Sequence, residues 1–496
     1  DDPIINRLEG FPEERLMGRD KDQQVISVAH YSDGSTRDVT RMTQFDSNDT
    51  EFAEVSVTGL VTTAKLTGSV AVMARYQGYV DVFRSTVPLG VPVETLPPEK
   101  NFVDQLVFAK LKALGLPAST VAGDATFLRR VTIDIAGRLP SQAEAEQFLS
   151  DQDPAKRDKL ITALLDSTDY ADYFANKWNA ILRNKRRRAE DRSATFAFYD
   201  WIRDSFYHNK PYDVFVREIV ASTGAPAKNP PVAWYREVKD QSAQVEDTAQ
   251  LFLGLRIQCA RCHHHPFEVW SQQDYYGFAA FFSRVGRKKS DFPGFDRIFH
   301  NRGVAQSQNP KTKQNVKPTG LGTPTLEIPQ DEDPRQYLAD WLADPENRFF
   351  AYALVNRYWK HFFGRGLVDP EDDMRVTNPA THPKLLDALA RDFITHKFDL
   401  KHLVRTICSS SVYQLSAEPN EWNRDDKQNY SRYFPKRLNA EVLLDSINQV
   451  AGTTTGFGGL PGGTRAVQLK DNGFSSYFLT VFGRPESSSA CECERS

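Results

Sequence analysis

The sequence predicts a multidomain protein in which an N-terminal all-β sandwich is followed by two mostly α-helical domains. Three observations lead to this prediction. The chain has 496 residues, more than a single hydrophobic core usually organises. Apolar residues alternate with period 2 from about residue 20 to 88, and recur at helical spacing from about residue 101 onward. Between the two patterns, residues 88–98 hold four prolines, which favour an extended linker.

The N-terminal segment has the features of short strands joined by turns. Residues 25–30, 70–74 and 80–83 alternate between apolar and polar side chains, and Asp33-Gly34 and Gln77-Gly78 are turn sequences. Turn signals about every ten residues are typical of a small β-sandwich. We therefore expect the sandwich over residues 1–88 and the linker over residues 89–100.

Helical signals begin directly after the linker. Val103, Val107 and Leu111 form an apolar stripe. Ser141 with Glu144 three residues later predicts a helix start closed by a capping box. These patterns predict a first helical domain over residues 101–300.

The first helical domain contains an apolar-rich segment over residues 245–258, which predicts a helix that ends at Cys259. Residues 301–332 are polar and rich in Pro, Gly, Lys and Gln, so we expect a connecting loop there. Helical periodicity resumes over residues 333–496, where His382-Pro383 places a proline at the first position of a new helix. The glycine-rich residues 452–463 lack the ending of a phosphate loop and are expected to be an exposed loop.

Composition narrows the class of protein and its compartment. The net charge of −3 gives no field that would attract nucleic acid or an anionic membrane. No run approaches the roughly 20 apolar residues that span a bilayer. The first residue is Asp1 rather than Met, so we expect an exported, extracytoplasmic protein whose signal peptide has been removed. Of the five cysteines, only Cys408 stands alone, in an apolar context that predicts a buried, inert thiol.

The segment Cys259-Ala260-Arg261-Cys262-His263 is the most informative motif of the chain. Two thiols three residues apart, followed at once by an imidazole, form the attachment signature of c-type haem. Cys259 and Cys262 would add to the two vinyl groups of the porphyrin, and His263 would be the proximal iron ligand. The sixth ligand is open. His382 is the most attractive candidate for it, because it starts a helix in the companion domain. The side chains that the sequence offers as sixth ligand are His265, His361, Met374, His382 and His402.

The same atoms also suit another metal ion. Soft thiolates and imidazoles bind zinc or iron, and the ligand set of this second interpretation is Cys259, Cys262, His263 and His265 with Cys491 and Cys493. A non-haem zinc, iron or calcium enzyme would act on an extracytoplasmic substrate such as a polysaccharide. The candidate catalytic residues are His265, Asp274 and His382, with Asp274 or Glu268 as a general base.

A third interpretation is not enzymatic. Aromatic residues make up 11% of the chain, which suits a surface or matrix protein that binds glycans or assembles around a structural metal. The simplest alternative is a pair of buried cysteines beside a polar histidine cluster. The partners expected across these interpretations are a redox partner or a small-molecule or glycan substrate.

Two parts of the chain resemble known families. The N-terminal segment resembles the bacterial Ig-like domain of group 2, through the strings Tyr31-Ser32-Asp33-Gly34-Ser35 and Val57-Thr58-Gly59-Leu60-Val61. That family is usually found in exported and surface proteins, so the resemblance implies a spacer or an association with the cell surface.

The helical part resembles the planctomycete cytochrome-associated domain of unknown function and the companion domain that habitually follows it. The residues that carry this resemblance are Phe127-Leu128-Arg129-Arg130, Gly137-Arg138-Leu139-Pro140, Cys259 to His263 with His265-Pro266-Phe267, Asn356-Arg357, Phe363-Gly364-Arg365-Gly366 and Phe482-Gly483-Arg484-Pro485. The resemblance implies an exported protein of a planctomycete-like bacterium and supplies no reaction. The companion family normally runs past the Cys491–Cys493 segment, so we expect the native domain to continue beyond residue 496.

Overall fold

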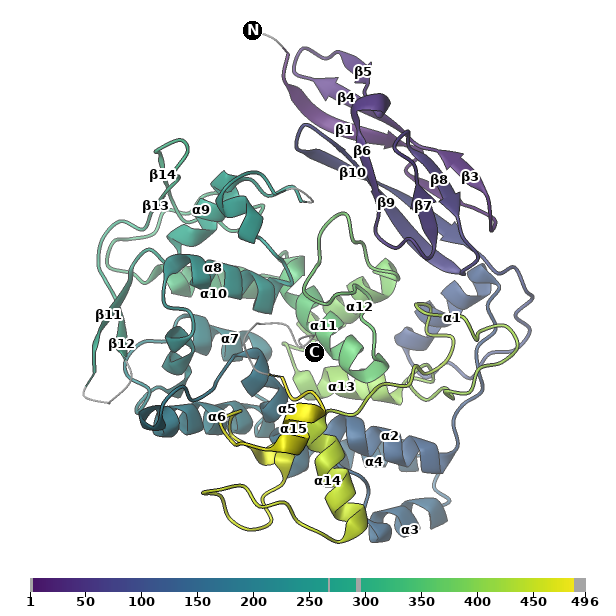
Figure 1. Ribbon diagram of the computed structural model, residues 1–496, viewed down its shortest axis with the longest axis vertical. Coiled ribbons are helices and arrows are strands. Elements are labelled where there is room, and N and C mark those ends of the chain that lie inside the picture. The colour runs from purple at the N-terminus through teal and green to yellow at the C-terminus, as the bar shows by residue number, and fades with distance from the viewer. Residues whose placement is uncertain (1–2, 266–267, 291–295, 486–496) are drawn as a thin grey trace.

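The computed structural model describes residues 3–265, 268–290 and 296–485 of the chain. A strand-rich N-terminal part projects from a larger helical body (Figure 1). The predicted fold class, an all-β domain followed by mostly helical structure, is confirmed. Among the described residues, no helix is both long and apolar enough to cross a membrane.

The N-terminal part consists of three small sheets. Their strand orders are β1-β4-β5, β2-β10-β9-β6 and β3-β8-β7. The hairpin between β9 and β10 turns at Gln77 and Gly78, whose φ angles of 48° and 88° are those that a two-residue hairpin turn requires. The strands are β1 (Ile5–Phe11), β2 (Glu14–Leu16), β3 (Asp22–Gln24), β4 (Ile26–Tyr31), β5 (Thr36–Asp38), β6 (Gln44–Ser47), β7 (Ala53–Val55), β8 (Leu60–Thr63), β9 (Gly68–Tyr76) and β10 (Tyr79–Val87).

The helical body begins after an extended segment over residues 88–100. Its first part contains α1 (Phe102–Leu114), α2 (Asp124–Ala136), α3 (Gln142–Ser150), α4 (Lys156–Leu165), α5 (Thr168–Ile181), α6 (Arg192–Tyr207), α7 (Tyr212–Val220), α8 (Gln241–Thr248) and α9 (Gln272–Ala280). Two short strand pairs follow, β11 (Val285–Lys289) with β12 (Asp296–His300) and β13 (Ser307–Gln308) with β14 (Asn315–Val316). The second part contains α10 (Pro334–Ala343), α11 (Arg348–Phe363), α12 (Pro383–Thr395), α13 (Leu400–Ser409), α14 (Ala440–Ala451) and α15 (Tyr477–Val481).

Several helix starts follow directly from local sequence. Ser141 and Glu144 form the predicted capping box of α3, in which each side chain accepts a hydrogen bond from the other residue's backbone N–H. His382 caps α12, and Pro383 takes the first helical position as predicted. Residues 452–463 form a loop without helix or strand, again as predicted.

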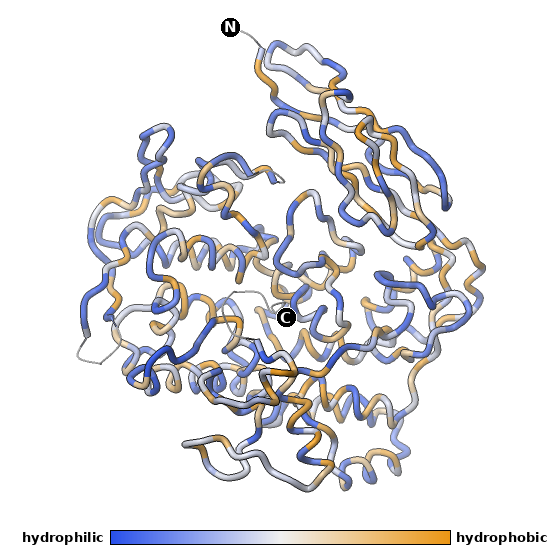
Figure 2. The backbone as a smooth tube through the Cα atoms, viewed as in Figure 1, coloured by the Kyte–Doolittle hydropathy of each residue, from blue (hydrophilic) through white to orange (hydrophobic). Residues whose placement is uncertain are grey.

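One hydrophobic core serves both parts of the helical body. A single buried cluster extends from Val103 to Val467. Aromatic rings from the two parts stack inside it, with 4.9 Å between the ring centroids of Tyr212 and Phe350 and 5.5 Å between those of Phe174 and Tyr358. Figure 2 shows hydrophobic and hydrophilic residues interleaved along these helices, as expected for helices that bury one face. The two helical regions therefore share their interior.

The sandwich contacts the helical body through polar groups. The Asn429 side chain donates to the Thr67 carbonyl oxygen at 3.0 Å, and the Gln428 side chain donates to that of Ser69 at 3.1 Å. Lys427 forms an ion pair with Glu51 at 2.6 Å. Side chains of residues 427–429 thus link the helical body to the sandwich, whose own buried clusters are separate from the helical core.

The prediction of one helix over residues 245–258 was wrong at its C-terminal end. The α-helix α8 ends at Thr248, a π-helical turn covers Ala249–Leu253, and the helical path stops at Gly254. Gly254 has a φ of +66°, and a Cβ on it would lie 3.1 Å from Met374. The chain therefore leaves the helix five residues before Cys259, because Gly254 adopts the left-handed conformation that ends a helix.

Candidate functional site

The Cys259–His263 segment forms a single exposed turn. Gln258–Arg261 is a 3₁₀ turn, and the backbone N–H groups of Cys262 and His263 donate to the Cys259 carbonyl oxygen at 3.2 and 3.3 Å. Both thiols are exposed and free of disulfide bonds. The turn therefore presents the two sulfur atoms and the His263 imidazole from one short stretch of backbone.

The His263 ring is held in one tautomer by its neighbour. Its Nδ1 lies 2.7 Å from the carbonyl oxygen of His264. A carbonyl oxygen can only accept a hydrogen bond, so Nδ1 carries a proton and the lone pair of the neutral ring is on Nε2. This is the arrangement in which metal-bound imidazoles are commonly held.

His265 is buried directly behind this turn. Its Nε2 donates to the carbonyl oxygen of Arg256 at 2.8 Å, and its backbone N–H donates to that of Trp270 at 3.0 Å. Burial lowers the pKa of His265, and the nearby positive charge of Arg375 acts in the same direction. His265 is thus a neutral imidazole that fixes the path of the loop.

Two buried carboxyl groups lie in the same region. Glu268 accepts hydrogen bonds from the backbone N–H groups of Val269 at 3.1 Å and Val376 at 3.0 Å. Burial raises the pKa of Glu268 to about 7, and the charge of Asp373 also raises it. Burial likewise raises the pKa of Asp373, whose carboxylate is paired with Arg375 at 3.2 Å. The region therefore contains a carboxyl group that exchanges its proton near neutral pH.

Residues 369–378 of the second helical region hold this loop in place. The fully buried Asp372 carboxylate accepts hydrogen bonds from Gln250 at 2.6 Å and from Nε of Arg256 at 3.1 Å. The backbone N–H of Met374 donates to the Gly254 carbonyl oxygen at 2.8 Å. The site around Cys259 is thus built jointly by both helical regions.

Other sequence candidates have structural roles elsewhere. Asp274 is the third residue of α9 and forms a capping box with Ser271. Both ring nitrogens of His382 bond to backbone, Nε2 to the carbonyl oxygen of Leu106 at 3.0 Å and Nδ1 to the N–H of Leu385 at 3.3 Å. These bonds assign Asp274 and His382 to helix capping, because a helix start leaves N–H groups that need acceptors. Cys491 and Cys493 lie outside the described residues.

Of the remaining proposed iron ligands, His361 and His402 bond to other parts of the fold, whereas Met374 lies beside the segment that leads to Cys259. Nε2 of His361 lies 2.8 Å from the carbonyl oxygen of Asp134 on α2. The Met374 side chain packs against Gly254, close to the Cys259 turn in sequence. His402 is paired with Asp392 at the α12–α13 junction.

Sequence reasoning missed a basic cavity of about 670 Å³. Asp134 lies in its wall and pairs with Lys436 at 2.9 Å. Seven cationic side chains and two aspartates line it: Lys177, Lys360, Arg365, Lys427, Arg432, Lys436 and Arg437, with Asp134 and Asp426. No local motif predicts this cavity, because its residues come from α2, α5, α11 and the loop after it, the segment before α14, and α14 itself.

Two family models match the helical body in the predicted order. Residues 102–287 match the PSCyt2 family, described as a protein of unknown function (DUF1549). Residues 334–491 match the PSD1 family, also described as a protein of unknown function (DUF1553). A search of curated proteins gave no match. The paired arrangement expected from the sequence is thereby confirmed.

Proposed function

We propose that this protein is an exported redox protein with a c-type haem attached at Cys259 and Cys262. Its chain joins a region similar to PSCyt2 proteins to a region similar to PSD1 proteins. The observation that carries the proposal is the state of His263. Its Nδ1 proton is engaged by the His264 carbonyl oxygen at 2.7 Å, so Nε2 bears the lone pair that an iron ligand needs.

The thiols fit the same group. Cys259 and Cys262 are exposed, and the hydrogen bonds to the Cys259 carbonyl oxygen hold both on one turn with His263. When bound, haem supplies an iron centre for electron transfer or for chemistry on a small ligand. The attachment reaction takes place outside the cytoplasm, so this proposal includes an extracytoplasmic location.

Nearby residues of the chain would control protons and position. Glu268, whose pKa burial raises to about 7, would be able to take up or release a proton near neutral pH. His265 stays neutral and keeps the loop in place through its bond to the Arg256 carbonyl oxygen. The Arg256–Asp372 pair ties the loop to the second helical region.

The test is an absorption spectrum with an intact mass, on full-length protein from a host that matures c-type cytochromes. We expect a Soret band and a covalent mass increase of one porphyrin, both lost in Cys259→Ser/Cys262→Ser. The matched control is Cys408→Ser, which changes a buried thiol and leaves band and mass unchanged. An unmodified mass without a Soret band would overturn the proposal.

A non-haem metal site is the second candidate, favoured by the hydrogen bond from His265 to a backbone carbonyl oxygen. Metal-bound imidazoles commonly donate their other N–H in this way. A protein without a Soret band that contains zinc or iron by elemental analysis, and loses it in Cys259→Ser/Cys262→Ser, supports this candidate. A protein with neither haem nor metal leaves the surface-binding function.

The basic cavity is a candidate binding site for an anionic ligand, whichever of these functions the protein has. Three of its seven cationic side chains, Lys427, Lys360 and Lys436, are closely paired with Glu51, Glu371 and Asp134. The positive charge that remains favours a small molecule or glycan that bears carboxylate, sulfate or phosphate groups. We expect an anionic oligosaccharide to bind in a salt-dependent manner and a neutral one not to bind. Arg437→Ala should weaken that binding, whereas Arg297→Ala on β12 should not.

A further inference from the structure

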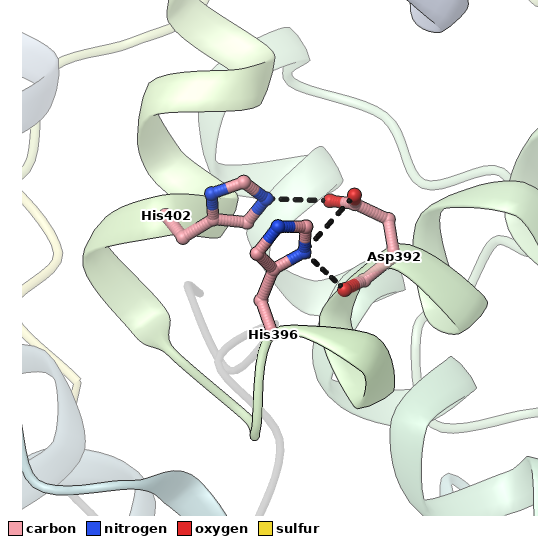
Figure 3. A group of neighbouring side chains, drawn as sticks. All are labelled: Asp392, His396 and His402. Carbon is pink, nitrogen blue, oxygen red and sulfur yellow. Dashed lines mark hydrogen bonds and ion pairs between the residues drawn. The ribbon is translucent and has the colours of Figure 1, made fainter.

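A cluster of two imidazoles and one carboxylate lies at the junction of α12 and α13, apart from the Cys259 turn. Figure 3 shows Asp392 and His396 on successive turns at the end of α12, with His402 of α13 beside them. We propose that Asp392, His396 and His402 form a binding site for a divalent transition-metal ion, with zinc as the reference ion.

The three side chains already converge on one point. Nε2 of His402 lies 2.8 Å from Oδ2 of Asp392, and Nδ1 of His396 lies 3.2 Å from Oδ1. One ligand atom from each residue lies within 4.8 Å of those of the other two. Tetrahedral zinc, with bonds of roughly 2.0–2.1 Å, separates its ligand atoms by about 3.3 Å, so binding requires the two stacked rings to rotate until both nitrogen lone pairs point at the ion.

The fold, rather than the ion, brings the two histidines together. The turn between the helices runs through Lys397 and Phe398, with φ angles of 56° and 57° that non-glycine residues rarely adopt. Phe398 is 8% exposed and packs on Phe393, with 5.4 Å between their ring centroids. Its carbonyl oxygen accepts the N–H of Tyr212 at 3.1 Å. Phe398 anchors this turn and keeps the two histidines close together, so binding costs little ordering entropy.

The chemistry of the cluster selects the class of ion. The imidazole rings of His396 and His402 are stacked, with 3.7 Å between their centroids, and both present nitrogen atoms to the same carboxylate. Two imidazoles with one carboxylate suit zinc, copper, nickel or iron(II), whereas calcium and magnesium prefer oxygen ligands alone.

Solvent reaches the cluster. The side chains of His396, His402 and Asp392 are 47%, 28% and 19% exposed, which lets an ion enter and keep water ligands. An ion at this place would displace the proton that Nδ1 of His396 now donates to the Asp392 backbone carbonyl oxygen at 2.8 Å and the contact between His402 and the Asp392 carboxylate, and it would join α12 to α13.

The experiment is a zinc titration followed by calorimetry, on full-length protein in a background that lacks the exposed and C-terminal thiols (C259S, C262S, C491S and C493S). Without these thiols the haem or metal site proposed above lacks its cysteine ligands. A failure of the zinc site proposed here can therefore be distinguished from a failure of the function proposed above. We expect one zinc ion per chain, and binding about tenfold weaker or more in His396→Ala and in His402→Ala.

His208→Ala is the matched control. His208 has the same spacing from Asp204 as His396 has from Asp392, and its Nδ1 lies 2.9 Å from the Asp204 carbonyl oxygen, compared with 2.8 Å for His396 and Asp392. Within the described residues, His208 belongs to no three-ligand group. We expect this variant to bind zinc like the background protein.

Copper(II) provides a readout of the ligands themselves. Electron paramagnetic resonance of the copper-loaded background protein should show coupling to two imidazole nitrogens, and to one in His396→Ala. Because His396 is half exposed, this variant is expected to fold normally, which circular dichroism checks. Zinc affinity unchanged in both histidine variants, or reduced equally by His208→Ala, would overturn the proposal.

Discussion

Asp372 and Arg256 form a two-point ion pair that joins the second helical region to the loop carrying Cys259. The Asp372 side chain is completely buried, whereas that of Arg256 is 42% exposed. The buried carboxylate also accepts a hydrogen bond from Gln250 at 2.6 Å. The pair therefore connects the two matched family regions at the candidate site.

Replacing Asp372 by Ala should destabilise the protein by about 1–3 kcal/mol. The change removes the acceptor for Gln250 and Arg256, but the exposure of Arg256 keeps the loss below that of a fully buried pair. Urea unfolding measures the loss, and proteolysis should become faster within residues 254–271. Asp340→Ala removes an exposed partner of Arg217 and should cost about 0.5 kcal/mol or less. An equal loss of unfolding free energy in the two variants would contradict a stabilising role of the Asp372–Arg256 pair.

The thiols should separate into two reactive classes. Cys259 and Cys262 are exposed, whereas Cys408 is fully buried and burial raises the pKa of its thiol well above the usual range. In protein produced without haem attachment, with C491S and C493S, a maleimide should label two thiols quickly and the third only after unfolding. Mass spectrometry counts the labels. Rapid labelling of Cys408 in folded protein would contradict the buried position.

Glu268 should make the protein less stable as the pH rises. Its pKa is raised by burial from 4.5 to about 7, so the unfolded chain loses this proton at lower pH than the folded chain. Stability is therefore lost as pH rises from about 4.5 to 7, by about 3 kcal/mol in total. Glu268→Gln should remove this dependence, as urea unfolding at several pH values would show. The exposed Glu327→Gln should keep the original profile, and parallel profiles for all three proteins would contradict the prediction.

His382 should produce the opposite dependence. Burial, assisted by the charge of Lys110, lowers the pKa of His382 from 6.5 to about 4. The unfolded chain then takes up this proton first, so stability is lost as pH falls from 6.5 to about 4, by about 3 kcal/mol. His382→Asn retains a side chain able to cap α12 and should reduce the loss. The comparison uses urea unfolding at pH 7 and pH 4, with the exposed His208→Asn as control, and an equal acid loss in both variants would count against it.

The sequence was most informative where the signal is local. The capping box of Ser141 and Glu144, the start of α12 at Pro383 and the turn at Gln77-Gly78 all depend on residues a few positions apart. Their hydrogen bonds and backbone angles are satisfied within one turn, so sequence patterns predict them well.

The parts that could not be predicted depend on distant contacts. The helix before Cys259 ends at Gly254, which adopts the left-handed conformation, and its packing against Met374 could not be predicted from residues 245–258. Glu268 acquires its shifted pKa only when it is buried beside the segment containing Val376. Asp274 and His382 have residue types suited to catalysis, yet the same side chains satisfy helix starts.

The buried cluster from Val103 to Val467 makes the two matched regions one cooperative folding unit. Separating the two regions would expose aromatic surfaces such as those between Tyr212 and Phe350, which the shared core now buries. The loop can be lengthened at little energetic cost, whereas we expect each region to be unstable when it is expressed alone. Their succession on one chain thus has a thermodynamic basis, independent of the chemistry at the Cys259 turn.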